Sequence, residues 1–251
     1  MRRVALVLGA LALAGCETTA EKSARLKGSV RQEALTQTSL SIARTSTQAR
    51  VLSSVAVQSS EGAALVVRVH NATGRTLREV PIAVSVRGAG GRALYQNNAP
   101  GLEAGLVCVG SLAPHQTLDW VDDQLPAGAG QGTVSARLGE SPSSTSSPPR
   151  VRVAGVRRTE DPSAGPGVSG TVINGSATAQ RSLVVFAVAR RAGKIVAAGR
   201  AVLPELAASS VAPFQLFLLG DVSGAKLQVA APPTTLRQAA LKRADGCRAS
   251  G

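Results

Sequence analysis

The chain has 251 residues, of which 44% are hydrophobic and only 2% aromatic, and its net charge is +13 at pH 7. Sugar-binding sandwiches and proteins that bind single-stranded nucleic acids use exposed aromatic side chains as stacking platforms, so this shortage counts against both classes. The basic residues are nearly all arginine and are scattered along the sequence. This pattern favours a solvated surface, weakly attracted to anions, over a dedicated anion-binding patch.

The N-terminal residues have the layout of a secretory signal. Two arginines precede an apolar run of 12 residues, positions 4–15, which ends at Cys16. The run is too short for a comfortable membrane span, which needs roughly 20 apolar residues. The stretch LAGC, ending at Cys16, resembles the bacterial lipobox. The resemblance implies that residues 1–15 are a lipoprotein signal peptide and that Cys16 becomes the acylated first residue, carrying palmitate-type chains.

An acylated Cys16 predicts an extracytoplasmic protein anchored to the outer face of a bacterial cell membrane. Two or three acyl chains hold a protein there stably, whereas one chain does not. Removal of residues 1–15 leaves 26 basic and 15 acidic residues, a net charge near +11. The anions available in that compartment are lipid headgroups and acidic wall polymers, so we expect no nucleic-acid partner.

Two further cysteines, Cys108 and Cys247, lie in a compartment where disulfides persist. A Cys108–Cys247 disulfide would tie the C-terminal tail to the first folded segment and stabilise it by about 4 kcal/mol through loop entropy. The alternative is that Cys108, in the apolar run GLVCVGSL, is a small buried side chain of a strand. Spacing alone leaves both interpretations open.

Residues 16–49 are polar, mixed in charge and poor in apolar side chains, which predicts a partly helical or disordered stalk. From residue 50 the periodicity changes to two, with short valine-rich runs such as RVLSSVAVQ and AALVVRVHN bounded by Gly, Asn or Pro. Such runs at this spacing predict a β-sandwich domain over residues 50–139. The Ser/Pro tract at 140–149 predicts a linker.

The strand pattern then restarts, which predicts a second β-sandwich over residues 150–232 and a tail over 233–251. Arg150-Val151 matches Arg50-Val51, and a strand ends at an asparagine in each copy, Asn71 and Asn174. A Leu-Ala pair is followed by an aromatic residue at the same separation in both, ending at Trp120 and Phe214. A Gly-Arg or Gly-Lys turn follows the asparagine in each copy, at Gly91 and Gly193. The asparagines, these turns and the aromatic residues occur in one order at offsets of 103, 102 and 94, which indicates a duplicated domain.

These landmarks resemble the FxLYD-like and related immunoglobulin-like domains of bacterial extracytoplasmic proteins. The resemblance covers residues 50–138 and 150–229, although the family's Pro-Gly turn is replaced in both copies, by APH at 113–115 and AAS at 207–209. It implies an all-β chain of two tandem immunoglobulin-like β-sandwiches that serve as spacers or binding modules. It carries over no catalytic residue.

The sequence contains no motif for a nucleophile elbow, a zinc protease, a Cys-x-x-Cys pair or a P-loop. We therefore expect no enzyme activity and no cofactor. The sharpest polar cluster is LDWVDDQ, with Asp119, Asp122 and Asp123 around Trp120. On a strand, Asp119 and Asp123 share a face and Asp122 points the other way, so a solvated strand edge is the first interpretation and a calcium site the alternative.

Trp120 has two interpretations. As the counterpart of Phe214 it would fill a sandwich core, and as an exposed aromatic between carboxylates it would be a binding anchor. The functional hypotheses are a structural or protein-interaction lipoprotein with an unknown envelope protein as partner, a module that binds anionic envelope polymers or lipid headgroups, and, disfavoured, an enzyme of unrecognised chemistry.

Overall fold

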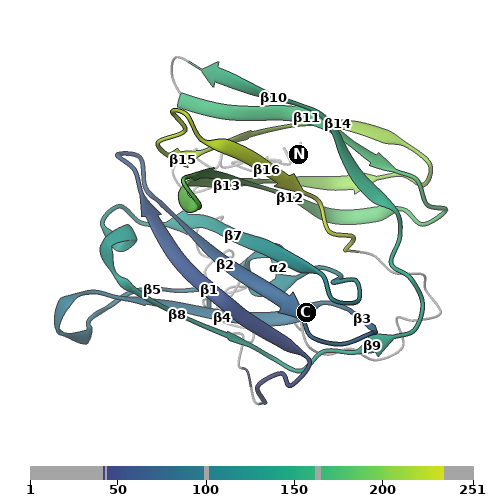
Figure 1. Ribbon diagram of the computed structural model, residues 1–251, viewed down its shortest axis with the longest axis horizontal. Coiled ribbons are helices and arrows are strands. Elements are labelled where there is room, and N and C mark those ends of the chain that lie inside the picture. The colour runs from purple at the N-terminus through teal and green to yellow at the C-terminus, as the bar shows by residue number, and fades with distance from the viewer. Residues whose placement is uncertain (1–41, 43, 99–101, 162–164, 235–251) are drawn as a thin grey trace, which may run out of the picture.

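The computed structural model describes residues 42, 44–98, 102–161 and 165–234, which form a mostly β structure (Figure 1). The predicted all-β class is confirmed. The predicted signal peptide, most of the predicted stalk and the tail after residue 234 lie outside the described residues. The last residues of the predicted stalk, 44–49, bond to the first half of the chain, where the Ser46 N–H donates to the Leu138 carbonyl at 2.7 Å.

The first half of the chain contains two principal sheets that enclose a core. One has the order β1-β2-β7, and in the other β4 pairs with β5, β6 and β8. A third, two-stranded sheet pairs β3 with β9. The elements are β1 (Ala49–Gln58), β2 (Ala63–Asn71), β3 (Thr76–Leu77), β4 (Val80–Arg87), η1 (Ala89–Gly91), β5 (Ala93–Gln96), α2 (Ala104–Val107), β6 (Cys108–Val109), β7 (Thr117–Leu125), η2 (Ala129–Gln131), β8 (Thr133–Leu138) and β9 (Ser143–Ser144).

The second half repeats this plan with longer strands. One sheet has the order β10-β11-β14 and the other the order β15-β13-β12-β16. The elements are β10 (Val151–Asp161), β11 (Gly165–Asn174), β12 (Gln180–Arg191), β13 (Lys194–Leu206), β14 (Val211–Phe217), β15 (Leu219–Gly220) and β16 (Lys226–Ala230).

The register of the first strand pair corrects one detail of the predicted repeat. Ala49 lies opposite Asn71 in the first half, and Val151 lies opposite Asn174 in the second. The first strands therefore correspond at an offset of 102, and the counterpart of Arg50 is Arg152. The predicted match with Arg150 is wrong by two residues, because a shared Arg-Val dipeptide is weaker evidence of equivalence than hydrogen-bonded pairing.

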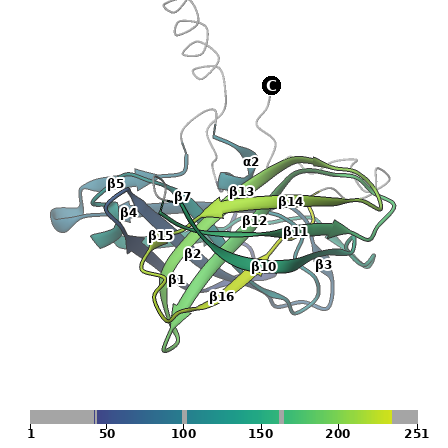
Figure 2. The ribbon, with the colours of Figure 1, turned by 90° about the horizontal axis from the view of Figure 1, so that it is seen from above.

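The four principal sheets stack in layers, with β1-β2-β7 of the first half against β12 and β13 of the second (Figures 1 and 2). Val184, Phe186, Val188 and Ala198 of the second half are buried in the same hydrophobic cluster as the first-half core. A separate cluster fills the space between β12-β13 and β10-β11-β14. The two halves therefore share a core.

Two segments differ from the sequence-based expectation. Residues 140–149, predicted as a linker, contain β9, and the Arg78 N–H donates to the Pro142 carbonyl at 3.0 Å. The run GLVCVGSL, predicted as one strand, forms the four-residue helix α2 and the two-residue strand β6. In α2 the Gly105 and Leu106 carbonyls accept hydrogen bonds from the side chains of Trp120 and Asn97.

Candidate functional site

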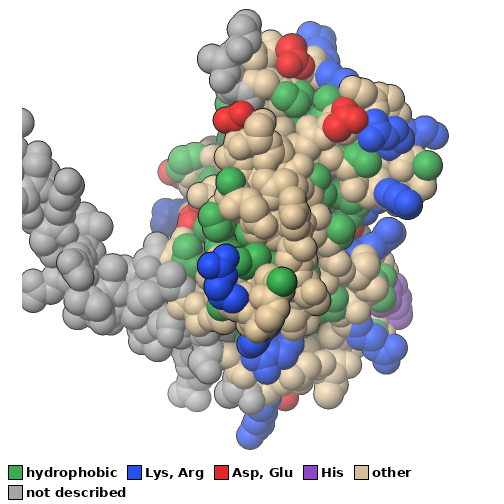
Figure 3. Space-filling model, turned by 90° about the vertical axis from the view of Figure 1, so that its left-hand side faces the viewer, with side chains coloured by type: hydrophobic (Ala, Val, Ile, Leu, Met, Phe, Trp, Pro, Cys, Tyr) green, Lys and Arg blue, Asp and Glu red, His purple; other side chains and the backbone are tan. Residues whose placement is uncertain are grey.

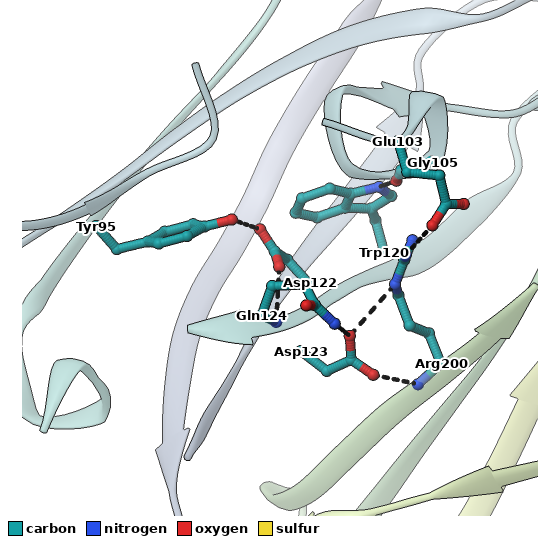
Figure 4. A network of polar contacts seen from close by, with 8 residues as sticks. All are labelled: Tyr95, Glu103, Gly105, Trp120, Asp122, Asp123, Gln124 and Arg200. Carbon is teal, nitrogen blue, oxygen red and sulfur yellow. Dashed lines mark hydrogen bonds and ion pairs between the residues drawn. The ribbon is translucent and has the colours of Figure 1, made fainter. Parts of the chain in front are cut away.

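The three aspartates of LDWVDDQ lie on β7, at the junction of the two halves. Figure 4 shows two of them, Asp122 and Asp123. Residues directly opposite in an antiparallel pair share a face of the sheet. Asp119 lies opposite the exposed Arg68, whereas Asp122 lies opposite the buried Leu65 of the first-half core. Asp119 and Asp123 thus face the second half and Asp122 faces the interior of the first, as strand alternation predicts.

The two outward aspartates each bind an arginine of the second half. Asp119 Oδ2 accepts a hydrogen bond from Arg190 Nη2 at 2.8 Å. Asp123 lies 3.3 Å from Arg200 Nε and also accepts the Arg200 backbone N–H at 3.2 Å. Arg200 Nη2 makes a second ion pair with Glu103, at 2.5 Å, and only 6% of the Arg200 side chain is exposed. These charge pairs hold the two halves in one register.

The inward side of β7 holds a hydrogen-bonding network around one buried carboxyl group. Asp122 is fully buried, and its Oδ2 accepts the Tyr95 hydroxyl at 2.6 Å while its Oδ1 accepts the Gln124 N–H at 3.0 Å. Trp120 is also fully buried, and its Nε1–H donates to the Gly105 carbonyl at 3.0 Å. Trp120 is therefore a core residue, and its burial contradicts the alternative of an exposed binding anchor.

Burial dominates the electrostatics of this site. Removal from water raises the pKa of the Asp122 carboxyl, and the hydrogen bonds from Tyr95 and Gln124 oppose that rise only in part. Burial, followed by the nearby Asp122 charge, raises the pKa of the Tyr95 phenol well above its ordinary range. The phenol thus stays protonated as a hydrogen-bond donor to the Asp122 carboxyl.

The geometry does not favour cation binding by the three aspartates. Asp119 and Asp123 already pair with arginines, and Asp122 points to the opposite side of the strand. No group of three or more His, Cys, Asp or Glu residues suited to a metal occurs within the described ranges. The calcium-site alternative therefore gains no support from this arrangement.

Asn71, the first landmark asparagine, is completely buried at the end of β2. Its side-chain amide donates to the carbonyls of Arg75, Leu112 and Ala113 at 2.7, 3.2 and 2.9 Å. Its Oδ1 accepts the N–H and the hydroxyl of Thr73. One side chain thus ties the turn after β2 to the segment before β7.

Asn174 repeats these contacts in the second half. Its amide donates to the carbonyls of Thr178, Leu206 and Ala207, and its Oδ1 accepts the N–H and hydroxyl of Ser176. The contacts to residues just after the asparagine recur at an offset of 103, and the contacts to residues before β7 and β14 recur at an offset of 94. Both asparagines are therefore fold-determining residues in matching positions, and neither is exposed for binding.

Cys108, in β6, is buried and lines a cleft of about 230 Å³ between α2 and β12. The Ser111 N–H donates to the Pro233 carbonyl at 2.7 Å, so the last described residues run beside this strand. Cys16 and Cys247 lie outside the described residues. The lipid anchor and the Cys108–Cys247 disulfide accordingly stay predictions.

Sequence reasoning missed the partners of the aspartates, namely Tyr95, Arg190 and Arg200, and the second partner of Arg200, Glu103. Tyr95 reaches Asp122 through the packing of the first half, and the packing of the two halves brings Arg190 and Arg200 to the aspartates. One signal was available, because Arg190 and Arg200 interrupt or border the two most apolar strands of the second half. An arginine in such a strand is costly to bury unless it is paired.

No protein-family model matches the chain, and no curated protein matches it. Within the described ranges, no helix has the length and apolar character needed to cross a membrane. Figure 3 shows Lys and Arg side chains in several separate groups over one face of the molecule. On this face the positive charge is therefore dispersed.

Proposed function

We propose that the protein is a lipid-anchored, extracytoplasmic, non-enzymatic module that presents a rigid double sandwich to a protein partner at the bacterial cell envelope. The repeated strand order supports interpreting each half as an immunoglobulin-like sandwich of the FxLYD-like kind. The lipobox-like stretch ending at Cys16 supports the anchor.

One observation carries this proposal. The ionisable groups buried at the junction are engaged in pairs that join the halves, and the apolar cluster is continuous across the junction. A joint of this kind favours a fixed scaffold over two domains that close on a substrate, because closure needs an interface that can open.

The anchor is tested by Cys16→Ser in the full chain. We expect loss of processing and of metabolic labelling with a fatty acid, and loss of partitioning into a detergent phase, because the serine hydroxyl cannot replace the thiolate as the acylated nucleophile. Cys108→Ser is the matched control and should keep the label. Continued acylation of the Cys16→Ser protein would contradict the proposed anchor.

A second candidate function is binding of anionic envelope polymers or lipid headgroups, which the net charge of +13 favours. A version lacking Cys16, incubated with phosphatidylglycerol vesicles or wall preparations, separates the two candidates. Retention that falls as salt rises supports the anionic ligand, since screening weakens such contacts. Absence of retention at low salt supports the protein-interaction module.

A further inference from the structure

No described element covers the outer face of the β10-β11-β14 sheet, whereas β12 and β13 cover the corresponding face of β1-β2-β7. Residues paired across the three strands point to the same side, which defines four outward rows of three residues. The rows are Arg152, Ile173 and Val211; Ala154, Thr171 and Pro213; Arg157, Ser169 and Gln215; and Thr159, Gly167 and Phe217. We call this surface the outer β10-β11-β14 face.

The outer β10-β11-β14 face combines exposed apolar side chains with positive charge. Val211 is 59% exposed and Phe217 is 42% exposed, and both lie on the edge strand β14. Arg152 and Arg157 are exposed on the opposite edge strand, β10. None of the residues in the four rows is acidic, and one carboxylate, Asp161, lies beyond the fourth row on the same side of the sheet. Exposed apolar area bordered by charge is typical of a binding surface.

We propose that the outer β10-β11-β14 face is the docking surface for an acidic protein, with carboxylates of the partner against Arg152 and Arg157 and an apolar patch against Val211 and Phe217. This inference rests on the proposed function, and it names the surface and the charge of the partner. Complementary charge sets the register of such contacts and rejects like-charged surfaces.

The first half provides a precedent for docking in this position. There, the equivalent face buries Ala64, Val66 and Val121 against the second half, and Asp119 and Asp123 pair with its arginines. In the outer β10-β11-β14 face the aspartates are replaced by Pro213 and Phe217, and the charge on the face is positive. The same strand arrangement therefore suits a partner of opposite sign.

A second copy of the chain does not have the required charge. The sheet face that would continue the stacking is the outer face of β4 and β8, where the exposed residues include Arg87 and Arg137. Pairing the outer β10-β11-β14 face with itself would likewise bring together two faces that both carry arginines. Both arrangements join surfaces of like charge, which disfavours self-assembly.

The test is site-specific photo-crosslinking of the full, anchored chain in the cells that produce it. The photoreactive amino acid benzoylphenylalanine replaces Val211 or Gln215, or Ser135 on the outer face of β8 as the control position. The charge variant is Arg152→Glu with Arg157→Glu. Its matched control, Arg87→Glu with Arg137→Glu, makes the same charge change on the other face. Unfolding midpoints of the purified variants establish that each is folded.

We expect a discrete protein adduct, identified by mass spectrometry, from Val211 and Gln215 and not from Ser135. The Arg152→Glu and Arg157→Glu variant should lower its yield by about tenfold or more, and the matched control should not. Protein adducts from Ser135 alone would overturn the inference and leave the proposed function standing. Lipid adducts alone would overturn it in favour of anionic-surface binding. Absence of adducts from all three positions would count against both this inference and the proposed protein-interaction function.

Discussion

The β1-β2-β7 and β10-β11-β14 sheets have the same strand order and different surroundings. Ala64, Val66 and Val121 are buried on the outer face of the first sheet, whereas their counterparts by register, Gly167, Ser169 and Gln215, are small or polar. The inner faces of the two sheets are alike, since Trp120 and Phe214 both fill cores. At these positions the outer residues are therefore apolar on the sheet that is covered and small or polar on the sheet that no described element covers.

The same contrast explains what strand periodicity reveals. β2 reads AALVVRV and is buried at nearly every position, because a core covers each of its faces. β14 alternates between buried and exposed side chains, as a strand with one free face does. A continuous apolar run within an otherwise alternating pattern thus indicates a central strand. Matched substitutions in the two halves test this comparison.

The largest expected effect is at Trp120. Trp120→Ala should lower the free energy of unfolding by about 3–5 kcal/mol, because it removes a fully buried side chain and leaves a cavity. Phe214→Ala should cost a similar amount in the second half. Urea unfolding followed by circular dichroism measures both. A stability unchanged by Trp120→Ala would contradict the core assignment.

The landmark asparagines should have equal effects in the two halves. Asn71→Ala and Asn174→Ala each strip hydrogen bonds from three carbonyls, which should cost about 2–3 kcal/mol apiece. Asn→Asp at either site should be no milder, since a carboxylate cannot donate to those carbonyls. A large difference between the two positions would show that the repeated contacts are not energetically equivalent.

The junction is tested by Arg200→Met. Loss of the pairs with Glu103 and Asp123 should cost about 2 kcal/mol, less than for a fully buried pair because both carboxylates keep some contact with solvent. Arg191→Met is the matched control, since its ion pair with Asp221 is exposed, and it should leave the unfolding midpoint unchanged. Equal effects of the two substitutions would contradict a special role of the junction.

Asp122→Asn should give the smallest effect and a pH signature. Burial raises the folded-state pKa of Asp122 above 3.8. Its contribution to stability is therefore fully present below the unfolded-state pKa and is lost as pH rises through the folded-state pKa. The neutral amide can still accept from Gln124 and donate to Tyr95, so the stability of the variant relative to the parent should increase as pH rises from the unfolded-state pKa, about 4, through the raised folded-state pKa. Urea unfolding over that range should show a widening difference, and a constant one would contradict the assignment.

Short-range patterns in the sequence were sufficient for much of the fold. The bounds of β2 and the alternation of Asp119, Asp122 and Asp123 follow from the period of two and from Asn71. Helix α2 could not be predicted, because the side chains that bond its carbonyls, Asn97 and Trp120, lie outside the helix in the sequence. The ion pairs of the junction could not be predicted either, since they join residues more than 70 positions apart. The continuous apolar runs were one available signal, because they imply that both faces of a strand are covered.

The central claim is that the two halves form one cooperative unit through the shared core. The direct measurement is the urea unfolding of Phe214→Ala followed by Trp120 fluorescence, since Trp120 is the only tryptophan and lies in the other half. Phe214 belongs to the second-half cluster, which is separate from the cluster that holds Trp120. The account predicts that the fluorescence midpoint falls together with the midpoint from circular dichroism. A fluorescence midpoint that stays at the parent value while the second half unfolds early would contradict it.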